Sequence, residues 1–416
     1  MPPSHVTADT APGSSATVSV ASEIEASHLP PGAPIQLLPQ DALHNVLGRL
    51  SLREALACRP VCRLFRDALS SSPFLSSLPS LRLLALRHPR SSAAAAAAVG
   101  RDAHRPFLLA LDPTLRHWIR LPLSFLPFPS ASPVTASPSP SLLYLWVDAS
   151  DASSGDFKSP RTLAVCNPLA GLHRLLPPLG SAWSRHGTVL AGPGGAVLVL
   201  TQLAALSYAP GSHIWLKFSL NLPSKPRSPI LVGGSIFALC DVGTPWRSLW
   251  RLFSCCLLDL REWAPLERPE WGDVLNILKW PRLLAGIGGG RILMIGGLRS
   301  SLAPDAPCST VLILRLDLAT MEWDEAGRMP SEMYRCFGGG ALSLAAAATG
   351  TNSKVKVFGG DGRVWFSGRK VKGKLAMWEE DDKSGCGQWS WVDGVPGCNE
   401  GVYRGFLFDA GFSATP

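Results

Sequence analysis

The sequence predicts a mainly β protein with a small all-α unit near its N-terminal end. Residues 35–74 carry apolar side chains at helical spacing. From residue 81 onward, short apolar runs alternate with Gly- and Pro-rich breaks, which is typical of strands joined by turns. A tryptophan recurs through this second region, which indicates an internal repeat.

The composition favours a turn-rich globular chain with reduced cysteines. The 416 residues include 39 Gly and 37 Pro, and such counts favour many short strands over a few long helices. The net charge of +8 comes mostly from scattered arginines, so neither nucleic acid nor a membrane is expected as a partner. The ten cysteines form no Cys-x-x-Cys pair, which argues against a zinc site. Reduced thiols fit a location in the nucleus, the cytoplasm or both.

The N-terminal region divides into a tail and a compact helical unit. Residues 1–33 are rich in Ser, Thr, Ala and Pro and lack apolar periodicity, so we expect a disordered tail. Apolar residues between Leu38 and Leu50 share one face of a first helix, and Pro39 can occupy its first turn. Two further apolar stripes, within 52–57 and 61–69, predict a second and a third helix. Residues 34–80 are therefore expected to form a three-helix unit.

Residues 81–416 show the internal repeat. A tryptophan near an apolar stretch recurs every 40–70 residues, and His173 holds the same place where one tryptophan is missing. The series is Trp118, Trp215, Trp263, Trp323, Trp389 and Trp391. Glycine pairs at 194–195, 233–234, 296–297 and 359–360 are expected at or near tight turns. About six such units, each with several strands, are typical of the blades of a β-propeller, where the tryptophans would fill the wedges between blades.

The end of the sequence predicts how this propeller closes. Residues 401–409 have the pattern of a strand but belong to no complete repeat unit. The first unit, 81–123, has room for only three strands. We therefore expect the C-terminal strand to join the first unit. Closure of this kind removes the exposed strand edges that promote aggregation.

The helical unit resembles an F-box. The resemblance is carried by Leu37-Leu-Pro-Gln-Asp-Ala-Leu-His-Asn-Val-Leu-Gly-Arg-Leu50, by Arg59-Pro-Val-Cys-Arg-Leu-Phe-Arg66 and by Ser72-Pro-Phe74. Phe65 stands where the family usually has tryptophan, so an aromatic side chain is retained. The repeated region is similar to kelch repeats in the divergent form of plant F-box/kelch proteins.

This resemblance implies a receptor subunit of an SCF-type ubiquitin ligase. The F-box would dock on a Skp-family adaptor that links to a cullin, and the propeller would hold the protein to be ubiquitinated. Such docking places an apolar helix face in a groove of another chain. The residues expected to contact the adaptor are Leu38, Pro39, Leu43, Val46, Leu47 and Leu50. The alternative is that these side chains only build the core of the F-box itself.

A series of arginines suggests where a substrate would bind. An arginine comes shortly before the apolar strand that opens each unit, and its spacing of 42, 55, 53 and 69 residues follows the tryptophan series. The series is Arg185, Arg227, Arg282, Arg335 and Arg404. At equal positions in a propeller these side chains would surround one mouth of the channel and select an acidic or phosphorylated peptide. The alternative is a chance alignment in an arginine-rich chain.

The sequence leaves two alternatives to the receptor function to compare. An enzyme is disfavoured because the nine histidines do not pair at metal-ligand spacing and no nucleophile elbow or phosphate-binding loop is present, so no cofactor is expected. A kelch interaction scaffold acting outside a ligase remains an alternative. Co-purification with the adaptor and the cullin distinguishes the scaffold from the receptor.

Overall fold

The computed structural model describes most of the chain from residue 37 onward. The described residues are 37–71, 74, 81–87, 107–128, 131–137, 142–148, 161–180, 187–244, 247–301, 307–338, 355–381, 387–396 and 402–416. The tail expected at 1–33 lies outside them.

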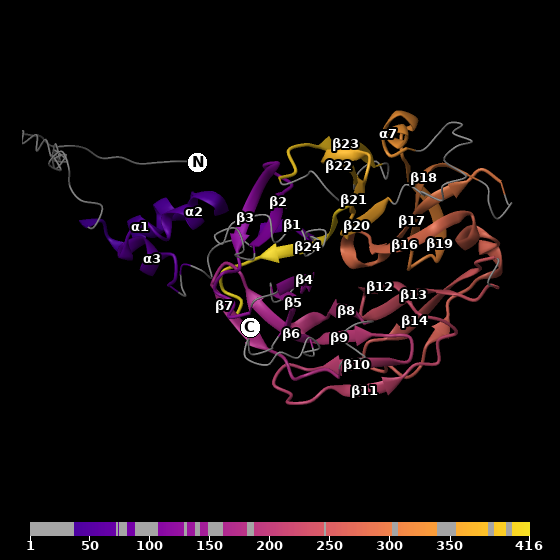
Figure 1. Cartoon of the computed structure of the whole chain (residues 1–416), viewed down its shortest axis with the longest axis horizontal. Helices are drawn as coiled ribbons and strands as arrows, with labels where there is room; N and C mark the ends of the chain where they lie inside the picture. Colours follow the sequence, from indigo (N-terminus) through magenta and orange to yellow (C-terminus); the bar gives the residue numbers. More distant parts are fainter. Residues whose placement is uncertain are drawn as a thin grey trace, which may run out of the picture.

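The described strands form six four-stranded antiparallel sheets, arranged as blades around a common centre (Figure 1). The predicted β-propeller of about six blades is thereby confirmed. Blade 1 consists of β24 (Arg404–Ala410), β1 (Leu81–Arg87), β2 (Phe107–Asp112) and β3 (His117–Pro122). Blade 2 consists of β4 (Ala131–Ala136), β5 (Leu143–Asp148), β6 (Arg161–Asn167) and β7 (Leu172–Leu175). Blade 3 consists of β8 (Thr188–Ala191), β9 (Val197–Leu200), β10 (Ala204–Tyr208) and β11 (Leu216–Ser219).

The other three blades follow in chain order. Blade 4 consists of β12 (Arg227–Val232), β13 (Ser235–Asp241), β14 (Trp250–Cys256) and β15 (Ala264–Pro265). Blade 5 consists of β16 (Leu278–Ala285), β17 (Arg291–Arg299), β18 (Cys308–Asp317) and β19 (Glu322–Arg328). Blade 6 consists of β20 (Lys356–Gly360), β21 (Arg363–Gly368), β22 (Val371–Glu379) and β23 (Gln388–Val392), and the helix α7 (Ser331–Cys336) precedes it.

The first strand of every blade lines the centre of the ring. These inner strands, β4, β8, β12, β16, β20 and β24, contact one another in sequence around the channel (Figure 1). All six run in the same direction, because each blade repeats the same antiparallel order. We call the end of the propeller where the inner strands begin the front face, and the end where they finish the back face.

The C-terminal strand β24 is the inner strand of blade 1. It pairs with β1 over seven register positions, from Leu81 opposite Ala410 to Arg87 opposite Arg404. It begins three residues later and ends one residue later than the strand expected at 401–409. Because β24 comes from the far end of the sequence, this pairing ties the last strand of the ring to the first.

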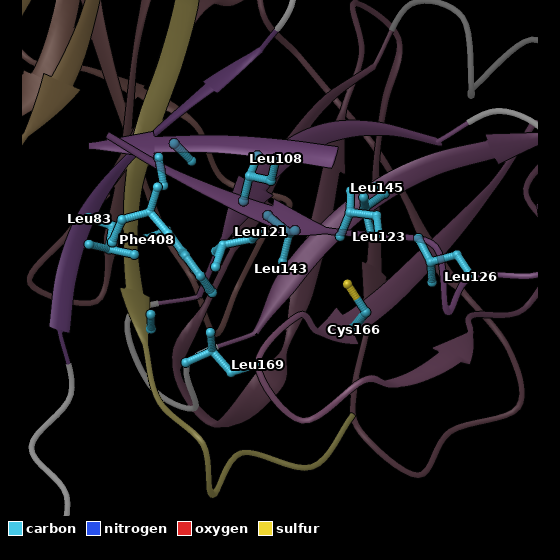
Figure 2. Packing of buried hydrophobic residues seen from close by; sticks show 14 of the residues in the cluster. Leu83, Leu108, Leu121, Leu123, Leu126, Leu143, Leu145, Cys166, Leu169 and Phe408 are labelled. Atoms are coloured by element: carbon cyan, nitrogen blue, oxygen red, sulfur yellow. The ribbon is translucent and has the colours of Figure 1, made fainter. Parts of the chain in front are cut away.

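The largest apolar cluster in this part of the ring joins blade 1 to blade 2. Its side chains come from both blades and from β24, as Figure 2 shows for Leu83, Phe408, Leu145 and Cys166. Leu83, Leu145 and Phe408 are completely buried. The alternating side chains of neighbouring sheets thus supply the apolar burial that stabilises the ring.

The tryptophan repeat marks the outermost strand of each blade. Trp118, Trp323 and Trp389 are each the second residue of such a strand, and His173 has this place in β7. Trp118 donates from Nε1 to the carbonyl oxygen of Asp393 in blade 6 (3.1 Å). Trp215 donates likewise to the carbonyl oxygen of Pro177 in blade 2 (2.8 Å). These side chains therefore connect neighbouring blades, as the repeat predicted.

The glycine pairs do not all have the same role. Gly194-Gly195 and Gly233-Gly234 have positive φ in the turns after inner strands, as expected. Gly296-Gly297 instead lies inside β17, and the corresponding turn is made by Gly288-Gly289, with φ of 73° and 69°. Gly296 serves another purpose, since a Cβ there would come within 2.7 Å of the carbonyl oxygen of Lys279 at a bulge in β16.

The helical unit consists of α1 (Gln40–Leu47), α2 (Leu52–Cys58) and α3 (Arg63–Ala68), and lies beside blades 1 and 2 (Figure 1). Ser51 and Glu54 form a capping box at the start of α2. Phe65 packs against the core of the unit. No helix in the described residues is long and apolar enough to span a membrane. The same residues contain no group of three or more His, Cys, Asp or Glu arranged to hold a metal ion.

Candidate binding surfaces on the propeller and the helical unit

Three of the five predicted arginines lie together on the front face. Arg227 is the first residue of β12, Arg404 is the first residue of β24, and Arg282 lies in β16 just after its bulge. All three strands line the channel. Their order in the ring therefore places these arginines around one side of its mouth.

The charges of these three side chains act on one another. Burial, followed by the charges of Arg227 and Arg404, lowers the pKa of Arg282 to about 10. Arg227 comes from blade 4 and Arg404 from blade 1, whereas Arg282 belongs to blade 5. The interaction thus crosses the channel mouth rather than running along one strand.

A fourth arginine, Arg87, belongs to the same cluster and was missed from the sequence. It is the last residue of β1 and lies directly opposite Arg404 in the strand register. Burial, followed by the charge of Arg404, lowers the pKa of Arg87 to about 10. Arg87 could have been found from the expected closure of the ring, because pairing the last strand with residues 81–87 brings Arg87 and Arg404 together. We call Arg87, Arg227, Arg282 and Arg404 the arginine cluster.

Aromatic rings support two of these guanidinium groups. The Cζ atom of Arg87 lies 5.6 Å from the centre of the Phe406 ring, and that of Arg227 lies 4.9 Å from the centre of the Trp250 ring. A ring face holds a flat guanidinium without using its N–H donors. Burial lowers the pKa of Arg227, and the charge of Asp241 opposes this only in part. The Oδ1 atom of Asp241 already accepts hydrogen bonds from the backbone N–H groups of Gly243 and Leu249.

On the back face, arginines form ion pairs with carboxylates. Arg315 donates to Glu380 (2.6 Å), Arg82 to Asp409 (2.8 Å) and Arg363 to Glu379 (2.6 Å). Within the described part of the chain, no carboxylate forms an ion pair with any member of the arginine cluster. The front face therefore presents concentrated positive charge, while the back face is neutralised by the protein itself.

Two of the predicted arginines do not join the cluster. Arg185 lies outside the described residues. Arg335 is exposed on α7, toward the outside of the ring (Figure 1), so its assignment to the channel mouth was wrong. The dipeptides Tyr334-Arg335 and Tyr403-Arg404 look alike in sequence, but a helix and a connecting segment separate Arg335 from β20, whereas Arg404 begins β24 directly.

Replacing Arg282 by Gln is expected to raise the free energy of unfolding at pH 7.5 by about 1 kcal/mol, because it removes a charge repelled by its neighbours. Folding lowers the pKa of Arg282 from its usual value to about 10, so the charged form opposes folding. Above pH 10 the stability of the wild type should therefore rise more steeply than that of Arg282→Gln, which keeps only the similar contribution of Arg87. Urea unfolding measures both effects, with Arg335→Gln as control. A less stable Arg282→Gln protein would contradict the repulsion.

The helical unit offers a second candidate surface. Leu38 and Val46 are exposed by 43% and 52%, and Pro39 is exposed beside them. Pro39 and Val46 are seven residues apart, two turns of helix, so they lie on the same side of α1. Three of the six residues expected to contact an adaptor thus face outward.

The other three residues have a different role. Leu43 and Leu47 are each only 2% exposed and form the core of the unit with residues of α2 and α3, and Leu50 packs against that core. In this structure Leu43 and Leu47 hold the helices together and are not available for direct contact. The helical spacing placed the three outward residues and the three core residues on one face. A stripe of apolar residues does not reveal which part of it the neighbouring helices cover.

Two further exposed apolar residues of the helical unit were missed from the sequence. Leu37 is 72% exposed directly before Leu38, and Val61 is 67% exposed in the turn between α2 and α3. Exposed apolar side chains gathered on one small unit mark an interaction site.

Comparisons with known proteins identify both parts of the chain. The family model described as F-box domain matches residues 35–77, and the one described as Kelch motif matches residues 279–330, which are nearly all of blade 5. SKP1-interacting partner 15 of Arabidopsis thaliana is 48% identical over 396 residues, covering 92% of this chain and 99% of that protein. The chain is an F-box/kelch protein. The helical unit is accordingly called the F-box below.

More distant likenesses are found as well. The Protein ABERRANT PANICLE ORGANIZATION 1 of Oryza sativa subsp. japonica is 29% identical over 350 residues, covering 74% of each chain. Among solved structures, the one described as "Structure of YjhT" aligns with 68% of this chain and 91% of its own, at 10% identity and a TM-score of 0.42. A likeness this remote says nothing about function.

Proposed function

We propose that this F-box/kelch protein is the substrate-recognition subunit of an SCF-type ubiquitin ligase. The observation that carries the proposal is the pairing of an F-box, whose apolar face has no partner within the described chain, with a closed propeller that presents a charged mouth. The relative from Arabidopsis thaliana is named for its interaction with SKP1, which supports the same assignment. In this role the chain binds two proteins and performs no chemistry of its own.

The F-box is proposed to dock on a Skp-family adaptor through its outward apolar face. Leu38, Pro39 and Val46 would enter a groove of the adaptor, with Leu37 and Val61 at the edges of the contact. Burial of such side chains against another chain stabilises a helix-in-groove complex. The adaptor would then link the receptor to a cullin.

Val46→Asp is expected to weaken binding of the full chain to a purified SKP1 adaptor by at least about 100-fold, because a carboxylate would be buried in an apolar contact. The exposed position of Val46 means that the F-box itself should stay folded. Isothermal titration calorimetry measures the affinity, and circular dichroism checks the fold. Asn45→Asp, which places the same charge on the next exposed position of α1, is the matched control.

Unchanged affinity of Val46→Asp would exclude this face as the docking site. Loss of affinity in Asn45→Asp as well would indicate a general effect of charge on α1. Absence of adaptor binding by the wild type would leave an F-box/kelch scaffold acting outside a ligase as the better function.

The propeller is proposed to hold the substrate at its front face, through an acidic or phosphorylated segment. The guanidinium groups of the arginine cluster form no ion pair with a carboxylate of the described chain, and such groups bind carboxylates and phosphates with paired hydrogen bonds. An anionic ligand would also relieve their mutual repulsion, so binding and stability should increase together.

A further inference from the structure

The F-box and the propeller are joined by a short covalent connection at the back face. Phe74 is the last described residue of the F-box, and β1 begins at Leu81, which pairs with the end of β24. A domain held only by such a connection is expected to move relative to its neighbour. Whether the F-box and the propeller form one rigid body therefore depends on a second, non-covalent contact between them.

Arg59 makes that second attachment. It follows α2 in the F-box, and its Nη1 atom donates a hydrogen bond to the carbonyl oxygen of Leu169, in the β6–β7 turn of blade 2. Its Cζ atom lies 5.8 Å from the centre of the Phe412 ring, just beyond β24. Leu169 and Phe412 are both buried members of the apolar cluster between blades 1 and 2. One F-box side chain therefore contacts the propeller at the seam where the ring closes.

Asn167 fixes both of the groups that Arg59 contacts. It is completely buried, and its Oδ1 atom accepts hydrogen bonds from the backbone N–H groups of Leu169 (3.0 Å) and Ala170 (3.2 Å). Its Nδ2 atom donates to three carbonyl oxygens after β24, those of Gly411 (2.9 Å), Phe412 (3.3 Å) and Ala414 (2.8 Å). A single amide thus positions the β6–β7 turn and residues 411–414 relative to each other.

We propose that Arg59 and Asn167 form an interdomain clamp that fixes the F-box on the propeller, with residues 411–414 as the surface on which it rests. This deepens the proposed function, because a receptor that holds its F-box rigidly presents the front face at a constant position relative to the adaptor. The clamp lies on the back face, so it leaves the arginine cluster free to bind a substrate.

The residue types at both positions follow from this role. Arginine can bond a carbonyl with one N–H while its flat face covers an aromatic ring, which lysine cannot do. Asparagine has donors and an acceptor on one short side chain, and both kinds of group are used here. Aspartate would keep the acceptor for Leu169 and Ala170 but would place a charge against the carbonyl oxygens of residues 411–414.

The test measures how broadly the distance between the two domains is distributed. Spin labels attached to unnatural amino acids at Asn45 on α1 and at Leu258, which is 95% exposed in blade 4, report this distance by pulsed electron resonance in the full chain. A narrow distribution is expected for the wild type. Arg59→Ala and Asn167→Asp should each broaden it at least about two-fold, since a tethered domain without a clamp moves freely.

Arg63→Ala is the matched control, because Arg63 is an exposed arginine of the same F-box that, among the described residues, forms no ion pair with the propeller. It should leave the distribution narrow. Circular dichroism and adaptor binding check that each variant is folded. Distributions as narrow as the wild type in both folded clamp variants would overturn the proposal, as would equal broadening by Arg63→Ala.

The outcome is separable from the proposed function. If the wild type fails to bind a SKP1 adaptor while the clamp variants still broaden the distance, the ligase role fails and the clamp stands. If the adaptor binds but the wild-type distance is already broad, the ligase role stands and the clamp fails.

Discussion

Phe408→Ala is expected to lower the free energy of unfolding of the propeller by about 3–5 kcal/mol, the usual range for removing a buried aromatic side chain. Phe408 is fully buried between blades 1 and 2 and belongs to β24 (Figure 2). Its removal weakens both the core and the strand that closes the ring. Urea unfolding, followed by tryptophan fluorescence, measures the change.

A surface leucine provides the control for this experiment. Leu216 lies on the outermost strand β11 and is 54% exposed, so Leu216→Ala should change the unfolding free energy by less than about 0.5 kcal/mol. A loss below about 1 kcal/mol for Phe408→Ala would mean that β24 contributes little to closure. The ring would then be held together mainly by contacts among the other blades.

Reversing two charges of the arginine cluster is the second change with a large expected effect. The double variant Arg282→Glu/Arg404→Glu should weaken binding of acidic and phosphoserine-containing library peptides by at least about 100-fold, because each reversal replaces an attraction by a repulsion. The two residues lie on different blades but interact electrostatically at the same mouth. Fluorescence polarisation with labelled peptides measures the affinity, and wild-type binding should weaken as salt increases.

The arginine outside the cluster supplies the comparison. Arg335→Glu adds the same kind of charge change on α7, so it should alter peptide affinity by less than about three-fold. Equal losses in both variants would show that overall charge, and not the cluster, attracts the peptides. No binding of any anionic peptide by the wild type would remove the acidic substrate class from the account.

The repeat unit was readable from the sequence because it depends on local spacing. The outermost strand of each blade carries a large ring side chain at its second position, as with Trp118, His173 and Trp323, or directly before its first residue, as with Trp215 and Trp263. The packing between blades requires a large side chain there. The strand at the C-terminal end could be expected to complete blade 1 because the first unit had too few strands. In both cases the residues that form the sequence pattern are also the ones that the packing of the blades requires.

The errors arose where similar sequences occupy different places. Tyr334-Arg335 resembles Tyr403-Arg404, yet α7 carries Arg335 away from the channel, and the first residue of β20 is Lys356 instead. Gly296-Gly297 looks like a turn but lies within a strand. Neither difference is visible without knowing where the connecting segments run.

The candidate sites were only partly accessible to sequence reasoning for the same reason. Leu43 and Val46 belong to one apolar stripe, and only the packing of α2 and α3 decides that Leu43 is buried and Val46 exposed. Arg87 joins the cluster through a strand pairing more than 300 residues apart in the chain. The contact between Arg59 and Leu169 has no sequence pattern at all.

Affinity purification of the full chain from plant cells tests the central claim most directly. A receptor subunit should recover a SKP1-type adaptor and a cullin together, and Val46→Asp should lose both while still recovering partners that bind the propeller. Recovery of propeller partners by the wild type without adaptor or cullin would contradict the ligase role and favour an interaction scaffold.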